Sequence, residues 1–393
     1  MSGIGLLRGR IIALAVAIVA LLAGGTWVAL SRASAQPGTS QAAATHQVVK
    51  KAPKPLVKPE TVVSVTPTSH SHDVNGASPI QVVFSAPLAD DSPMPTLSPS
   101  IAGAWQRVNA TTVEFVPAAG FTQNTYARVI VPDGPAGPRS TAGGVLTARF
   151  VDRFWTGSYS TMRLEQLLAQ LGYLPLTWEP IAGVTPVTAT DENGQLDAAY
   201  DPPQGTFTWQ SGYPSTLQDF WSPGQTGVML TGAVMAFENH EGMDMDGVAG
   251  PAVWKAVLNA VAKGDDNPSG YTYAIADKGN PETLTIWHDG HEVLNTLANT
   301  GIPGRETVNG TFPVYLKYQN QIMKGTNPDG TKYADQVSWV SYFNGSDAVH
   351  YYPRPTYGWP QSLGCVELPY NQAKESYPYL TYGSLVTVTG TAG

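Results

Sequence analysis

A single cysteine, Cys365, occurs in the 393 residues of this chain, so no internal disulfide can hold any part of the fold together. Each folded part must instead be stabilised by burying apolar side chains. The chain has room for roughly two to four domains, and 42% of its residues are hydrophobic, which is enough for sizeable cores. A lone thiol therefore needs a reason other than covalent cross-linking, and we expect nucleophilic catalysis.

A histidine, His350, precedes the cysteine by fifteen residues. A free thiol has a pKa of roughly 8.5 and becomes a good nucleophile at neutral pH when an imidazole takes its proton. Gly364, directly before the thiol, allows a sharp backbone turn and exposes main-chain N–H groups that can form an oxyanion hole. The pair alone also fits a small buried cysteine beside an ordinary strand histidine, so both interpretations stay open at this point.

The residues around the cysteine extend this pattern into a recognisable motif. They read Ser362, Leu363, Gly364, Cys365, Val366 and Glu367, and further signals lie in the threonine-bearing segment 307–312 and at Ile322, Met323 and Trp339. On these residues, the segment 266–393 resembles the L,D-transpeptidase (YkuD-like) catalytic domain. The signature of that family is a histidine, a gap of similar length, and Ser-His-Gly-Cys followed by an apolar residue and Asn or Arg. Here Leu363 replaces the second histidine and Glu367 replaces the Asn or Arg.

The resemblance implies a mostly β, sandwich-like catalytic fold and a set of site residues. Cys365 and His350 are expected to be catalytic. Support of the oxyanion and of the histidine is expected from Gly364, Ser362 and Tyr351, the last through its carbonyl, and substrate binding from Tyr352, Trp359, Met323 and Glu367. We expect no cofactor and no metal. The resemblance also implies acylation by carbapenems and indifference to most penicillins.

The implied reaction is ping-pong acyl transfer between stem peptides of peptidoglycan. Cys365 attacks the carbonyl between the diamino acid and D-alanine, the N–H groups of Gly364 and Cys365 hold the oxyanion, and His350 protonates the departing D-alanine. An amine of a second stem then resolves the thioester. Two alternatives stay open: an L,D-carboxypeptidase, if water resolves the thioester, and a non-catalytic scaffold that binds the cell wall.

Chain order and spacing weigh against other chemistries. In papain-like and NlpC/P60-like peptidases the cysteine precedes the histidine, and a sortase would need an arginine after the cysteine, whereas the last arginine here is Arg354. His240 with Glu241 lacks a second histidine at zinc-ligand spacing. Asp244 and Asp246 lack the remaining ligands of a calcium loop, so a turn that caps the next helix is expected there.

The N-terminal region predicts export. Residues 11–30 carry no charge and are flanked by arginines, which is typical of a membrane anchor, and the triplet at 33–35 also suits a signal-peptide cleavage site. Segment 1–35 is therefore a signal peptide or anchor, and 36–60 a disordered linker. Everything after the first segment is expected outside the cell, at the membrane or wall. The net charge of -8 argues against a nucleic-acid partner, and we expect a monomer.

Two further modules are expected between the linker and the catalytic domain. Residues 61–155 show short alternating runs at 80–84, 112–116, 126–131 and 146–150, which predict an antiparallel β-sandwich and resemble bacterial Ig-like domains. Residues 156–265 carry apolar helical stripes that begin at Leu164 and Val253. This segment resembles the peptidoglycan-binding domain 1 family, through the end of its first helix at 171–173 and the run 246–254.

The catalytic segment is expected to be mainly β. Apolar alternation predicts strands at 284–288, 292–294, 312–318, 337–343, 348–352 and 385–388, with a short helix at 370–377. The whole chain is thus predicted to be multidomain and mainly β, with an N-terminal membrane segment and one small helical wall-binding domain.

Overall fold

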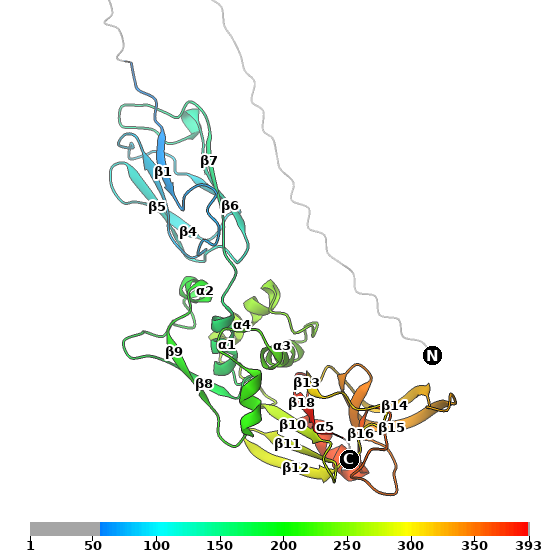
Figure 1. Cartoon of the computed structure of the whole chain (residues 1–393). Coiled ribbons are helices and arrows are strands. Elements are labelled where there is room, and N and C mark those ends of the chain that lie inside the picture. Colours follow the sequence, from blue (N-terminus) through cyan, green and yellow to red (C-terminus); the bar gives the residue numbers. More distant parts are fainter. Residues whose placement is uncertain (1–55, 392–393) are drawn as a thin grey trace, which may run out of the picture. The chain divides into compact units, whose positions relative to one another are not determined.

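The computed structural model describes residues 56–391 (Figure 1). The predicted signal peptide or anchor at 1–35, and the linker as far as residue 55, lie outside the described residues. Among residues 56–391, no helix is both long and apolar enough to cross a bilayer.

The first part of the described chain is a β domain of two antiparallel sheets. One sheet has the order β1-β2-β5-β4 and the other β3-β6-β7. The strands are β1 (Val62–Thr66), β2 (Ile80–Phe84), β3 (Thr96–Ser98), β4 (Gly103–Arg107), β5 (Thr112–Pro117), β6 (Tyr126–Val131) and β7 (Phe150–Trp155). In β2, residues 80, 82 and 84 are buried and alternate with partly exposed ones, so one face of each strand enters a common core.

One predicted strand of this domain, 146–150, is wrong. Leu146 is buried in the core, but it follows a turn in which Arg139 pairs with Val145, and β7 begins only at Phe150. An apolar side chain that fills the core from a loop carries the same sequence signal as a strand residue. The 3₁₀ turn η1 (Gly134–Ala136) lies just before this loop.

The next part of the chain is mainly helical. It contains α1 (Thr161–Gln170), β8 (Leu176–Pro180), α2 (Glu192–Tyr200), β9 (Gly205–Trp209), η2 (Ser215–Phe220), α3 (Val228–His240) and α4 (Pro251–Lys263). The predicted stripes are the buried faces of α1 and α4, and β8 pairs with β9 as a hairpin. Helix α4 starts with proline in its first turn and ends at Gly264 with a φ of 67°.

The predicted capping turn before α4 is wrong in its detail. Asp246 accepts a hydrogen bond from the N–H of Val248, inside the loop, and Glu238 accepts one from Gly247. The residue at the N-cap of α4 is Gly250, which has no side chain to cap the helix.

The C-terminal part consists of two sheets and one helix. The five-stranded sheet has the order β12-β11-β10-β18-β13, and the four-stranded sheet has the order β14-β15-β16-β17. The elements are β10 (Thr272–Asp277), β11 (Thr283–His288), β12 (His291–Leu297), β13 (Gly310–Pro313), β14 (Leu316–Thr326), β15 (Lys332–Asn344), β16 (Asp347–Tyr351), β17 (Val366–Leu368), α5 (Tyr370–Tyr379) and β18 (Leu385–Thr389).

The predicted strand 312–318 is in fact two strands in different sheets. β13 ends at Pro313, which cannot donate to a ladder, and the chain crosses to the second sheet before β14 begins at Leu316. The first strand of the region, β10, was not predicted. It pairs in parallel with β18, near the C-terminal end of the chain.

Apolar side chains of both sheets form one core, which includes Leu284 and Ile286 of one sheet and Val349 and Val366 of the other. Helix α5 packs against β15 and β16. A second core joins the helical region to this part of the chain, because Tyr273 and Leu385 pack among the residues of α1, α3 and α4. β16, which carries His350, and β17, which begins directly after Cys365, are therefore held in a well-packed framework.

Candidate active site

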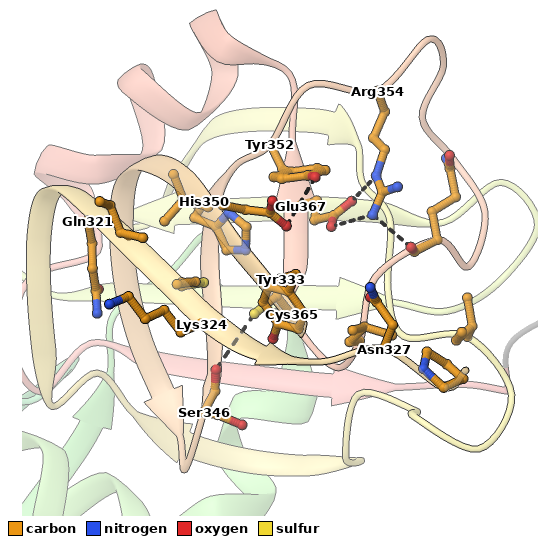
Figure 2. Close-up of a pocket in the computed structure, with 18 of the residues that line it drawn as sticks. Gln321, Lys324, Asn327, Tyr333, Ser346, His350, Tyr352, Arg354, Cys365 and Glu367 are labelled. Carbon is orange, nitrogen blue, oxygen red and sulfur yellow. Dashed lines mark hydrogen bonds and ion pairs between the residues drawn. The ribbon is translucent and has the colours of Figure 1, made fainter. Parts of the chain in front are cut away.

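Two neighbouring parallel strands bring the predicted histidine and cysteine together. His350 lies near the end of β16 and pairs in register with Glu367 of β17. Cys365 lies directly before β17, two residues before Glu367, and both side chains line the same pocket as His350. Figure 2 shows His350, Cys365 and Glu367 around one pocket.

The pocket has a volume of about 590 Å³. The hairpin of β14 and β15 lines it with Gln321, Ile322, Met323, Lys324, Asn327, Pro328, Asp329, Tyr333, Asp335, Val337 and Tyr342, and Ile302 and Ser346 join the lining. The segment that runs from His350 to the cysteine supplies Tyr352, Arg354, Gln361 and Leu363, with Glu367 just beyond. The lining combines both signs of charge with apolar side chains.

Cys365 and His350 are both uncharged at rest. The Cys365 thiol donates to the carbonyl oxygen of Ser346 over 3.6 Å, and burial raises its pKa to about 12. His350 is 3% exposed, and burial lowers the pKa of its imidazole despite the hydrogen bond to Tyr351. The carbonyl of Tyr351 can only accept, so Nδ1 of His350 carries the proton, at 3.0 Å. Nε2 is left as the basic nitrogen of a neutral imidazole.

The turn before the cysteine is fixed by Ser362. Its hydroxyl donates to the carbonyl of Cys365 at 2.6 Å and accepts from the N–H of Gly364 at 3.1 Å. Gly364 has a φ of 125°, and a Cβ there would lie 2.6 Å from Oδ1 of Asp347. Ser362 therefore supports the turn, and the N–H of Gly364, which was predicted to be an oxyanion donor, is bonded to the Ser362 hydroxyl in this structure.

A β-bulge lies directly opposite the histidine. Ser338 pairs with Tyr351, and Ser341 pairs with Val349, so Trp339 and Val340 together face His350. Trp339 has a φ of 61°, the one non-glycine residue with a left-handed backbone inside a strand of residues 56–391. Bulges bend a strand and change the direction of nearby side chains. Sequence patterns did not indicate this bulge.

Glu367, which was predicted to bind substrate, lines the pocket with its carboxylate held in an ion pair. Its side chain is 6% exposed and bonds to Arg354 through two contacts of 2.8 Å, Nε to Oε2 and an Nη to Oε1. Sequence reasoning missed Arg354. The signal in the sequence was Glu367 itself, because it stands between the apolar residues Val366 and Leu368. A carboxylate that such neighbours bury needs a cation or several hydrogen-bond donors.

The remaining predicted residues divide between the pocket and the surface. Met323 and Tyr352 line the pocket, and the Tyr352 hydroxyl donates to Asp335 at 3.2 Å. Trp359 is 49% exposed and does not line it. Nowhere in residues 56–391 do three metal-ligating side chains gather. His240, which lacks a second histidine at zinc-ligand spacing, is hydrogen-bonded to Tyr173 at 2.5 Å.

Comparisons with known proteins bear on residues 271–388, which match the family model YkuD, the L,D-transpeptidase catalytic domain. No curated protein matches the chain. Among solved structures, L,D-transpeptidase 3 from Mycobacterium tuberculosis, in complex with a faropenem-derived adduct, is 16% identical and has a TM-score of 0.29. The match covers 84% of this chain and 98% of that chain.

Two further solved structures are similar to this chain. An L,D-transpeptidase from Mycobacterium smegmatis is 14% identical over 85% of this chain and 100% of that chain, with a TM-score of 0.29. The catalytic domain of the E. faecium L,D-transpeptidase is 30% identical over 30% of this chain and 96% of that chain, with a TM-score of 0.28.

Proposed function

We propose that the protein is a cysteine-dependent L,D-transpeptidase that cross-links peptidoglycan stem peptides, on the premise that residues 271–388 are a YkuD L,D-transpeptidase catalytic domain. The observation that carries the proposal is that one pocket is lined by both His350, on β16, and Cys365, directly before the adjacent parallel strand β17. The wall is outside the membrane, so the proposal includes export. The β domain and the helical region are proposed as an Ig-like spacer and a wall-binding module.

In the first half-reaction, Cys365 Sγ attacks the carbonyl carbon of the bond between the diamino acid and D-alanine. The thiol proton passes to Nε2 of His350, because Nδ1 is held by Tyr351. The C–N bond then breaks, and His350 returns this proton to the amine of the departing D-alanine. The product is a thioester between Cys365 and the diamino acid.

In the second half-reaction, an amine of another stem attacks the thioester carbon. His350 takes the proton of that amine and returns it to the sulfur as the C–S bond breaks. The oxyanion of each tetrahedral intermediate needs main-chain donors close to the sulfur. Since the N–H of Gly364 bonds to Ser362, we assign this role to the N–H of Cys365.

The test is mass spectrometry of a purified disaccharide-tetrapeptide after incubation with the full-length protein, with Cys365→Ala alongside. Cross-linked dimers that vanish in the variant are expected. The matched control is Arg139→Met, which removes a surface ion pair with Asp91 in the N-terminal β domain. This variant should keep its activity. Tripeptide without dimers would identify a carboxypeptidase instead, and unchanged substrate with a folded sample would contradict the enzyme and favour a wall-binding scaffold.

A further inference from the structure

The ion pair of Arg354 and Glu367 has no part in the mechanism above, yet it lies beside the catalytic histidine. Glu367 pairs in register with His350 across β16 and β17. Neighbouring residues of a parallel pair project from the same face of the sheet. The carboxylate of Glu367 and the imidazole of His350 are therefore side-by-side neighbours, and both residues are buried.

A buried carboxylate beside an imidazole would ordinarily pair with it and favour its protonated form. Such a pair would remove the neutral imidazole that takes the thiol proton. Here the carboxylate oxygens are occupied elsewhere. Arg354 donates to both of them at 2.8 Å, and Asn299 approaches Oε2 at 3.5 Å.

Arg354 is itself fixed at three points. Besides Glu367, its guanidinium donates to the carbonyl of Gln361 at 2.8 Å, and it lies 4.7 Å from the centre of the Tyr352 ring. These contacts join the start and the end of the segment between the histidine and the cysteine. A fork-shaped guanidinium can hold a carboxylate and a carbonyl together, which the point charge of a lysine cannot do.

We propose that Arg354 is a positioning residue that holds the Glu367 carboxylate away from the His350 imidazole, so that this imidazole stays available to Cys365. The inference rests on the proposed function, because it assigns His350 the role of the base. It adds a requirement that the catalytic motif does not contain: an acidic residue two positions after the nucleophile needs a partner cation from the preceding segment.

Other charged groups around the imidazole do not replace this partner. Besides His350, Arg354 and Glu367, the titratable side chains that line the same pocket are Lys324, Asp329, Tyr333, Asp335, Tyr342, Tyr352 and Cys365, and all but the last two come from the hairpin of β14 and β15. Helix α5 meets the opposite face of β16, where Tyr370 packs on Tyr351. The electrostatic influences on the His350 pKa come from Glu367, which raises it, and from Arg354, which lowers it.

The experiment is an NMR titration of the His350 imidazole in the full-length protein, with its signal assigned by loss in His350→Gln. In Arg354→Met the unpaired Glu367 should raise the His350 pKa by about one unit or more. In the double variant Arg354→Met/Glu367→Gln the titration should return to the wild-type value. Arg139→Met, which breaks a distant surface pair, should leave it unchanged.

Activity gives a second readout of the same variants. Arg354→Met should lose about two- to fivefold in kcat/KM near pH 6.5 for a one-unit shift and recover as the pH rises, and the double variant should regain most of the loss. An unshifted His350 titration in a folded Arg354→Met protein would overturn the proposal. If Arg354→Met does not fold, the test is the His350 titration in the double variant Arg354→Met/Glu367→Gln. A folded double variant with wild-type titration supports the proposal, and an unfolded or shifted one overturns it.

The titration needs neither substrate nor turnover. A wild-type protein that leaves muropeptides unchanged would therefore overturn the proposed function while the role of Arg354 toward His350 is still measured.

Discussion

The thiol of Cys365 donates a hydrogen bond to the main-chain carbonyl of Ser346 over 3.6 Å. A thiol that donates is a protonated thiol. The pKa of about 12 that follows from its burial agrees with this, and burial also lowers the pKa of His350. The resting site therefore holds a neutral thiol and a neutral imidazole, and the thiolate forms only when a substrate is attacked.

We predict slow alkylation of Cys365 by iodoacetamide in the absence of substrate. Near pH 7 the second-order rate should be at least about tenfold below that of free cysteine, because so little of the sulfur is thiolate, and the rate should rise steadily above pH 9. Intact-protein mass spectrometry follows the adduct, with Cys365→Ser as the control. Rapid labelling at pH 6 would instead indicate a thiolate–imidazolium pair at rest.

A second prediction concerns the hydroxyl of Ser362, which bonds to the carbonyl of Cys365 and the N–H of Gly364. Ser362→Ala leaves both main-chain groups without this partner in a buried turn. An unpaired buried polar group costs about 1–3 kcal/mol, so we expect acylation by a carbapenem to slow by roughly 5- to 150-fold. Acylation is measured by mass spectrometry.

The control for Ser362 is Ser338→Ala, which removes an exposed hydroxyl bond to Asn320 on the neighbouring strand. This variant should acylate at nearly the wild-type rate. A Ser362→Ala protein with unchanged acylation and an unchanged melting temperature would show that the turn holds without the hydroxyl. Ser362→Thr keeps the oxygen and should retain more of the rate.

A third prediction separates backbone strain from steric clash at Gly364. Gly364→Ala combines a φ of 125° with a Cβ 2.6 Å from Oδ1 of Asp347. The left-handed backbone costs of order 1–3 kcal/mol, and the clash adds to it, so we expect more than tenfold loss of turnover and a lower melting temperature. Adding Asp347→Ala should relieve the clash but not the strain, and should recover only part of the loss.

The matched control is Gly345→Ala in the turn between β15 and β16. Its φ is 54°, and nothing lies within 4 Å of a Cβ there. This substitution should have a small effect on turnover, because alanine tolerates that conformation better and meets no neighbour. Equal losses in the two single variants would refute the assignment of the Gly364 effect to Asp347.

A large share of the secondary structure could be predicted, because strands and helices leave their pattern in neighbouring residues of the sequence. The strands β2 and β6 match their predicted bounds, since alternation with a period of two is written into consecutive residues. The stripes of α1 and α4 are equally local. The candidate pair of His350 and Cys365 could be proposed because a free thiol and an imidazole have few other joint uses.

The features that sequence reasoning missed depend on contacts between distant residues. The partner of Glu367 is thirteen positions away, and only the segment that folds between them brings Arg354 there. The bulge at Trp339 comes from a positive φ that no apolar pattern encodes. β13 and β14 are separate strands because they join different sheets. The packing of the core decides which sheet each strand joins, and the alternation of apolar residues along the chain does not reveal it.

The last prediction concerns the stability of the helical region. Glu165 accepts hydrogen bonds from Trp221 Nε1 and Gly224 N–H, yet burial raises the pKa of its carboxyl to about 7. A carboxyl with a higher pKa in the folded protein binds more protons when folded. Its contribution to stability is complete below the unfolded pKa near 4.5 and is lost as the pH rises through 7.

Between pH 5.5 and 8 the melting temperature of this region should fall by about 2–4 °C for each kcal/mol of stability lost. Glu165→Gln should reduce this slope, whatever its absolute stability, and leave the part that comes from Glu238, because burial also raises the pKa of that carboxyl to about 7. The exposed Glu179→Gln should keep the full slope. Calorimetry at several pH values measures both slopes, and identical slopes in wild type and Glu165→Gln would assign the titration to another group.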